Sequence, residues 1–187
     1  VSAVLANSAI RNNDKVGVIL FSDKIEKFIP PKKGNSHILR IIRELVDLIP
    51  ASKGTNLTVA LNYLNNVIRK RSVVFLLSDF MTDNYEPMLH IAARKHDIIG
   101  IHVFDHGETV LPEMGLLQVQ DAETGKIKCI DTSGSAIKKQ YAKKYADHLQ
   151  AVTSTFQRSG IDYVSINTHD NYIRALMMLF ERRTKRI

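Results

Sequence analysis

Short apolar runs and amphipathic segments alternate along this chain. Residues 16–21, 72–77 and 98–104 are almost continuously apolar, which is typical of parallel strands covered on both faces. Between these runs, apolar residues recur at the three- and four-residue spacing of amphipathic helices. The expected helices cover residues 1–12, 38–49, 57–68, 85–96, 135–158 and 171–182. Repetition of strand, helix and strand predicts an α/β fold built on a doubly wound, mostly parallel sheet.

The last third of the chain changes character. Residues 116–120 and 126–130 alternate strictly between apolar and polar and flank Asp121-Ala-Glu-Thr-Gly125, which predicts an antiparallel hairpin with one wet face. Residues 161–166 form a further expected strand, and residues 24–29 an edge strand that ends before Pro30 and Pro31. Because no internal repeat or flexible linker interrupts the pattern, we expect one domain over residues 1–187, with the hairpin inserted at about 109–131.

Composition excludes several classes of protein. With 187 residues, 44% hydrophobic and 24% charged, the chain can build a core, unlike disordered or collagen-like sequences. The single cysteine, Cys129, excludes disulfides within the chain and a zinc site of cysteine type. No apolar run reaches the roughly 18 residues of a membrane span, and we expect a cytoplasmic location. Since Val1 lies inside an expected helix, we also expect a piece of a longer polypeptide.

The net charge of +7 permits binding to nucleic acid or acidic lipid. Basic residues gather in the expected helix 135–158 and in the tail, at Lys138, Lys139, Lys143, Lys144, Arg182, Arg183, Lys185 and Arg186. No aromatic residues interleave with them as in a single-strand binding groove. A solvated basic face or an acidic protein partner is the favoured interpretation, and nucleic-acid binding is an alternative.

Two residues carry candidate chemistry, because ligands of open α/β sheets gather at the carboxyl ends of the strands. Asp79 follows the strand that ends near Ser78, and Thr55 precedes the helix 57–68. A carboxylate and a hydroxyl are hard oxygen ligands suited to Mg²⁺ or Mn²⁺. The alternative is that both residues only cap local structure. His102 and His106, with Asp105 nearby, are a weaker candidate for zinc.

Several motifs resemble a known family. Gly54-Thr-Asn-Leu-Thr-Val-Ala-Leu61 and Ser72-Val-Val-Phe-Leu-Leu-Ser-Asp-Phe80 look like the second half of a von Willebrand factor A domain. More narrowly, the chain resembles a bacterial family of unknown function, number fifty-eight. The residues that carry this likeness are Asn13-Asp-Lys-Val-Gly-Val-Ile-Leu-Phe-Ser-Asp23, Phe28-Ile-Pro-Pro-Lys-Lys-Gly34, Leu77-Ser-Asp-Phe80, Leu111-Pro-Glu-Met-Gly115 and Ile130-Asp-Thr-Ser133.

The resemblance implies a von Willebrand factor A-like (Rossmann-like) domain and a metal-ion-dependent adhesion site that includes Thr55 and Asp79. It implies Mg²⁺ or Mn²⁺ in the full-length protein, and we expect none in this fragment. It further implies a MoxR-type AAA+ ATPase as partner. The expected function is metal-assisted protein binding in the assembly or maturation of protein complexes, without enzymatic activity. A metal-dependent phosphoryl-transfer or hydrolytic enzyme is the alternative.

One part of the family pattern is missing. The D-x-S-x-S loop of the adhesion site should follow a strand that precedes Val1. A literal D-x-S-x-S occurs at Asp131, Ser133 and Ser135, where we expect these side chains to cap the next helix. Without the missing strand, we expect strands 16–21 and 72–77 to pair with each other or with a second copy of the chain.

Overall fold

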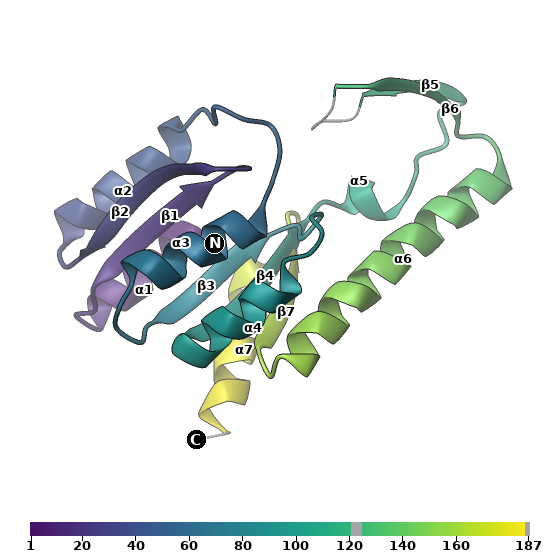
Figure 1. The fold of residues 1–187 in the computed structure, drawn as a ribbon. Coiled ribbons are helices and arrows are strands. Elements are labelled where there is room, and N and C mark those ends of the chain that lie inside the picture. Colours follow the sequence, from purple (N-terminus) through teal and green to yellow (C-terminus); the bar gives the residue numbers. More distant parts are fainter. Residues whose placement is uncertain (121–124, 186–187) are drawn as a thin grey trace. The chain divides into compact units, whose positions relative to one another are not determined.

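The computed structural model describes residues 1–120 and 125–185. The chain folds into two compact units, Val1–Val67 and Ile68–Ile187. Figure 1 labels the helices and strands of both units. Among the described residues, no helix is both long and apolar enough to cross a membrane.

The first unit is a two-stranded antiparallel ribbon with three helices. Its elements are α1 (Ser2–Arg11), β1 (Val16–Phe21), β2 (Ile25–Lys32), α2 (Asn35–Asp47) and α3 (Leu57–Val67). In the β1–β2 register, Ile19 lies opposite Phe28. The prediction that the second strand ends before Pro30 was wrong, because β2 continues through Pro30 and Pro31. Both prolines are exposed, and an edge strand tolerates residues without an N–H donor.

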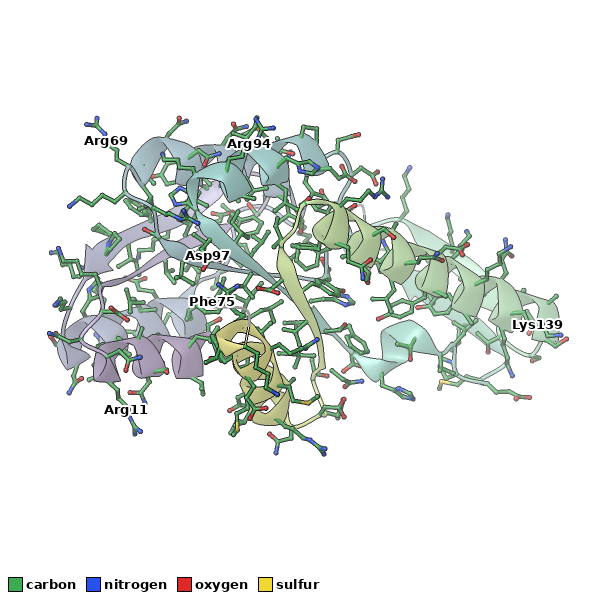
Figure 2. All side chains as sticks on the ribbon, turned by 90° about the horizontal axis from the view of Figure 1, so that it is seen from below. Arg11, Arg69, Phe75, Arg94, Asp97 and Lys139 are labelled. Atoms are coloured by element: carbon green, nitrogen blue, oxygen red, sulfur yellow. The ribbon has the colours of Figure 1, made fainter. Side chains whose placement is uncertain are left out.

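The second unit contains a parallel three-stranded sheet in the order β3–β4–β7. Its elements are β3 (Val73–Ser78), α4 (Glu86–Lys95), β4 (Asp97–Phe104), α5 (His106–Thr109), β5 (Leu116–Gln120), β6 (Ile127–Asp131), α6 (Ser135–Arg158), β7 (Asp162–Asn167) and α7 (Tyr172–Thr184). Helix α4 covers one face of the sheet and α7 the other (Figures 1 and 2). The predicted mixed α/β class is thus confirmed, as are the parallel strands expected at residues 72–77 and 98–104. The parallel pairing expected for residues 16–21 was wrong, because β1 pairs antiparallel with β2.

Close packing on the sheet depends on one glycine of β4. Gly100 is buried, and a Cβ built there would lie 2.4 Å from Phe156 Cε1. The absence of a side chain lets the Phe156 ring lie directly on β4. Phe80 completes this aromatic core, with its ring centroid 5.1 Å from that of Phe156 in an edge-on arrangement.

An arginine of α7 joins the amino ends of two neighbouring strands. Arg183 Nη1 donates to Asp162 Oδ2 at 2.6 Å, and Nη2 donates to Asp97 Oδ2. Asp97 and Asp162 are the first residues of β4 and β7, so one guanidinium group fastens the last turn of α7 to the sheet. The sequence interpretation placed Arg183 in a basic tail, and the structure makes it an internal contact. Arg186 of that tail lies outside the described residues.

The predicted hairpin is confirmed as the antiparallel pair β5–β6, in which Gln118 lies opposite Cys129. Its expected turn residues, Asp121 to Thr124, lie outside the described part of the chain. Thr132 is fully buried at the base of the hairpin. Its hydroxyl donates to Gly115 O (2.7 Å) and accepts from Met114 N–H (2.9 Å). These bonds fix the base of the hairpin close to the start of α6.

The expected direct pairing between strands 16–21 and 72–77 would join the two units, and it stays a prediction. In the described part of the first unit β1 pairs with β2, and in that of the second unit β3 pairs with β4. A connection of three residues brings β2 onto β1 at low loop-closure cost. Pairing of either strand with a second copy of the chain stays a prediction.

Candidate functional site

Thr55 lies in the loop between α2 and α3, and this loop is anchored at the carboxyl end of β1. The Asn56 N–H donates to Ser22 O at 2.9 Å. The Asn56 side chain also caps α3, because its Oδ1 accepts from Val59 N–H at 3.2 Å. Helix α3 therefore starts from a fixed point beside the β1–β2 turn, and Thr55 is placed there with it.

A second contact holds the same loop. The buried Ser22 hydroxyl donates to Glu26 Oε1 at 2.6 Å, and the Ala51 N–H donates to the same oxygen at 3.1 Å. The hydrogen bond from Ser22 is the main cause that lowers the pKa of Glu26. Loss of solvent opposes this change, and the hydrogen bond from the Ala51 N–H adds to the lowering. The ionised Glu26 thus links the β1–β2 turn to the loop that carries Thr55.

Asp23 adds a carboxylate beside this loop that our sequence interpretation missed. It is exposed, and a Cβ on Gly54 would lie 3.6 Å from the Asp23 Cβ. The signal in the sequence is the Ser22-Asp23 pair directly after an apolar strand, which mirrors Ser78-Asp79.

In the second unit, Asp79 stands exposed at the carboxyl end of β3. Its Oδ1 accepts from the Met81 N–H (3.1 Å) and from the Ser78 hydroxyl (3.3 Å). No hydrogen bond from the part of the chain that the structure describes reaches Oδ2. The carboxylate is thus oriented through one oxygen and keeps the other for solvent or a ligand.

The residue after Asp79 explains this orientation. Phe80 has a left-handed backbone (φ 56), which costs energy for a residue with a side chain. Its N–H donates to Ser78 Oγ at 3.0 Å, and its ring is fully buried. The tight turn therefore sends Phe80 into the core and leaves Asp79 at the surface.

The imidazole of His102 interacts electrostatically with the imidazole of His148 and with the Asp79 carboxylate. His102, on β4, is 1% exposed, and its Nδ1 is hydrogen-bonded to Ser165 Oγ at 2.7 Å. Among the described residues, neither His102 Nε2 nor His148 Nε2 has a hydrogen-bond partner. The pKa of His102 is lowered to about 4, mainly by burial and also by His148, while Asp79 opposes the change. The His102 imidazole is therefore neutral at pH 7.

The donor set at Asp79 fits a hard divalent cation only in part. Within the described ranges, no group of three or more histidine, cysteine, aspartate or glutamate side chains could hold a metal ion. Mg²⁺ accepts one or two carboxylates and keeps several waters, so Asp79 can serve as one ligand of several. Thr55 belongs to the first unit and Asp79 to the second, and a site that joins them stays a prediction.

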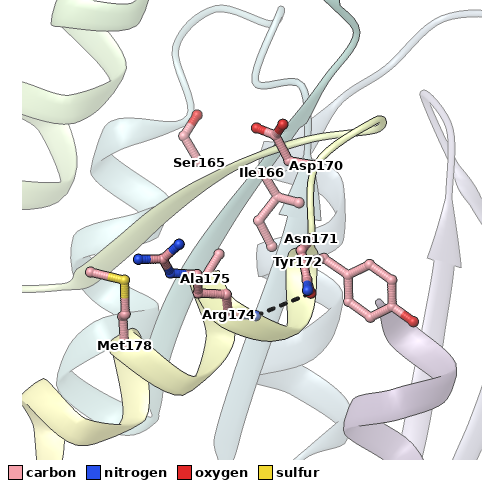
Figure 3. A pocket seen from close by; sticks show the side chains of 8 residues that line it. All are labelled: Ser165, Ile166, Asp170, Asn171, Tyr172, Arg174, Ala175 and Met178. Atoms are coloured by element: carbon pink, nitrogen blue, oxygen red, sulfur yellow. Dashed lines mark hydrogen bonds between the residues drawn. The ribbon is translucent and has the colours of Figure 1, made fainter.

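A shallow pocket of about 340 Å³ lies along β7 and α7 (Figure 3). Its lining residues are Ser165, Ile166, Asp170, Asn171, Tyr172, Arg174, Ala175 and Met178. The Asn171 side chain caps α7 and accepts from Ile173 N–H (3.1 Å) and Arg174 N–H (3.4 Å). Because the protein itself satisfies these amides, the helix start is not free for an anion.

Comparison with known proteins identifies a family. Residues 1–151 match the model described as protein of unknown function DUF58. The chain belongs to the DUF58 family. The resemblance to family number fifty-eight is thereby confirmed. The match covers the first unit and the second as far as residue 151 in α6, and it includes Thr55 and Asp79.

Curated relatives of this DUF58 chain come from mycobacteria. Uncharacterized proteins of Mycobacterium bovis and Mycobacterium tuberculosis are each 24% identical over 191 residues, which cover 98% of the chain. The chain spans 60% of the length of these two relatives. An uncharacterized protein of Mycobacterium avium is 25% identical over 84% of the chain and 94% of its own length. No solved structure matches the chain.

The literal D-x-S-x-S of this DUF58 chain forms a local turn. Asp131 Oδ1 accepts from the Ser133 N–H at 2.9 Å. Thr132, the residue between these two in the sequence, is buried. The N-cap of α6 is Gly134, and no side chain makes a capping hydrogen bond there. The prediction that Asp131, Ser133 or Ser135 caps this helix was therefore wrong, because Asp131 closes the preceding turn instead.

The zinc alternative finds no support in the arrangement of its residues. His102 is buried, whereas His106 is exposed at the start of α5. Asp105 is engaged by Gly107 N–H (2.8 Å) and by the Thr168 hydroxyl (2.7 Å). These bonds hold the connection after β4 against the one after β7.

Proposed function

We propose that this DUF58 chain is a metal-assisted protein-binding module of the von Willebrand factor A type. In this proposal Asp79 and Thr55, with an oxygen-rich loop from outside this chain, hold Mg²⁺ or Mn²⁺. An acidic side chain of a partner protein completes the coordination of the ion. The partner is a MoxR-type AAA+ ATPase, and the two act together in the cytoplasm in the assembly or maturation of protein complexes.

One observation carries the proposal, and it is the presentation of Asp79. Asp79 is an exposed carboxylate at the carboxyl end of a parallel strand. Its Oδ1 accepts two hydrogen bonds, and its Oδ2 faces no donor in the described part of the chain. Such a group is suited to bind a cation at the surface. Ligands of open α/β sheets collect at this edge. The anchored loop of Thr55 and the nearby Asp23 supply the same ligand chemistry at the carboxyl end of β1. The ATPase partner and the full fold rest on the resemblance alone.

The test uses the full-length protein and the purified ATPase in a pull-down with Mg²⁺ or with chelator. We expect Asp79→Ala to abolish the Mg²⁺-dependent recovery, since a ligand is lost. The unfolding free energy should fall by about 1 kcal/mol or less, because the two hydrogen bonds of Asp79 are exposed. Thr55→Ala should weaken recovery to a smaller extent.

Asp83→Ala is the matched control, because Asp83 is an exposed carboxylate four positions further along the chain. It should leave recovery unchanged. Equal recovery with Mg²⁺ and with chelator, or normal recovery with Asp79→Ala, would remove the ion from the mechanism.

A further inference from the structure

The first half of α6 is an extended helix that the rest of the described structure leaves without a core. Helix α6 runs from Ser135 to Arg158, but its buried residues are Val152, Thr155 and Phe156. None of residues 135–151 is buried. Figure 2 shows Lys139 at the far end of this projecting helix. Since packing of an amphipathic face supplies most of the stability of a helix, this half of α6 lacks its usual support.

The exposed half nevertheless carries an apolar stripe that continues from the core. Phe156 and Val152 are buried, and the ring of Tyr145 lies 6.3 Å from that of Phe104. Beyond this point, Ile137 and Tyr141 continue the same stripe at helical spacing, and each is 36% exposed. We call these two residues, with their helix turns, the outer stripe of α6.

Lysines border the outer stripe on both sides. At 3.6 residues per turn, Lys138 lies on one side of Ile137 and Tyr141, and Lys144 lies on the other. Lys139 and Lys143 fall on the opposite side of the helix. Residues 135–150 contain these four lysines and one acidic residue, Asp147. Lys138 is paired with Glu113 at 2.7 Å, an exposed contact worth little that a partner can replace.

We propose that the outer stripe of α6 is a docking surface for an acidic amphipathic helix of a partner protein. Apolar side chains of the partner cover Ile137 and Tyr141, and its carboxylates reach Lys138 and Lys144. Charge complementarity selects this occupant over a second copy of the chain, since two such surfaces would place lysines against lysines. The surface is independent of the metal site proposed above.

Two other occupants fit the stripe less well. A helix that lies in a membrane surface buries a broad apolar face, whereas this stripe is narrow and bordered by charge. Nucleic acid requires cations that follow a phosphate backbone along one surface, whereas these lysines point to opposite sides of the helix. The test below therefore measures binding of lipid vesicles and of DNA beside that of the peptide.

The test measures binding of the full-length protein to a fluorescent helical peptide of about 20 residues, with leucines along one face and glutamates beside them. Parallel titrations use vesicles of phosphatidylglycerol and phosphatidylcholine in equal parts, and a DNA duplex. We expect the double variant Lys138→Glu/Lys144→Glu to weaken peptide binding by about tenfold. Ile137→Ser/Tyr141→Ser should weaken it to a similar degree.

Lys139→Glu/Lys143→Glu is the matched control, because it changes the net charge equally on the opposite side of α6. It should weaken peptide binding by less than about twofold. Hydrogen exchange on the unmodified protein gives a second measurement that needs no variant, and we expect the peptide to slow exchange of amides 137–149.

Three results would overturn the proposal. The first is that the acidic peptide does not bind, or binds without protecting residues 137–149. The second is that both lysine pairs weaken binding equally, which would indicate attraction to the net charge alone. The third is that vesicles or DNA bind more tightly than the peptide, with the same dependence on Lys138 and Lys144.

Discussion

Arg183 offers the sharpest test of how the second unit is held together. Its guanidinium group is 23% exposed and binds Asp162, which is 20% exposed, and Asp97, which is 35% exposed. Arg183→Ala would remove the cation and leave two carboxylates side by side at the amino ends of β4 and β7. We expect this change to destabilise the protein and to loosen the last turn of α7.

The magnitude follows from the partial burial of the three groups. Removing one partner of a buried ion pair costs roughly 3–5 kcal/mol, and solvent screening at Asp97 places the cost at the lower end. We therefore expect a loss of about 3 kcal/mol in the free energy of unfolding. For a chain of this size, that loss lowers the midpoint of thermal unfolding by roughly 6–12 °C.

Urea titration and calorimetry measure the effect, with Arg182→Ala as the control. Arg182 is the preceding residue, is exposed, and donates to Met178 O of its own helix at 3.2 Å. Its removal should cost less than about 0.5 kcal/mol. In the background Asp97→Asn/Asp162→Asn, the cost of Arg183→Ala should fall to about 1 kcal/mol, because no carboxylates are then left unpaired. If Arg183→Ala costs no more than Arg182→Ala, or costs the same in both backgrounds, the reasoning is refuted.

Two further predictions concern the core of the same unit. Gly100→Ala should cost about 2 kcal/mol in a urea titration, because the new methyl group would overlap the Phe156 ring, and adding Phe156→Leu should recover part of that loss if the overlap is the cause. The pKa of His102 is about 4 in the folded protein, against an ordinary value of 6.5. As the pH falls, the unfolded chain therefore takes up this proton before the folded protein does. The free energy of unfolding should fall by about 3 kcal/mol between pH 6.5 and pH 4. Unfolding measured across this pH range should lose much of that slope in His102→Asn, and an unchanged slope would contradict the assignment.

Local pattern was sufficient for most elements of the fold. The long helix was predicted as residues 135–158, and α6 has these bounds. The alternation of residues 116–120 predicted the hairpin strand β5, which has the same bounds. Helical and strand periods are properties of neighbouring residues, so a single sequence carries them. Asp79 at the end of an apolar run was likewise visible, as was the family resemblance.

Long-range contacts were decided by the tertiary structure. Arg183 meets Asp97 across 86 positions of sequence and Asp162 across 21, and from sequence it was indistinguishable from the neighbouring Arg182. The anchoring of the Thr55 loop by Ser22 and Glu26, the burial of His102 and the unsupported half of α6 also became visible only in the fold. A charge or an apolar stripe looks the same in sequence whether it meets solvent or a partner. Its environment depends on which distant segments the chain brings beside it, and residue periodicity carries no information about that choice.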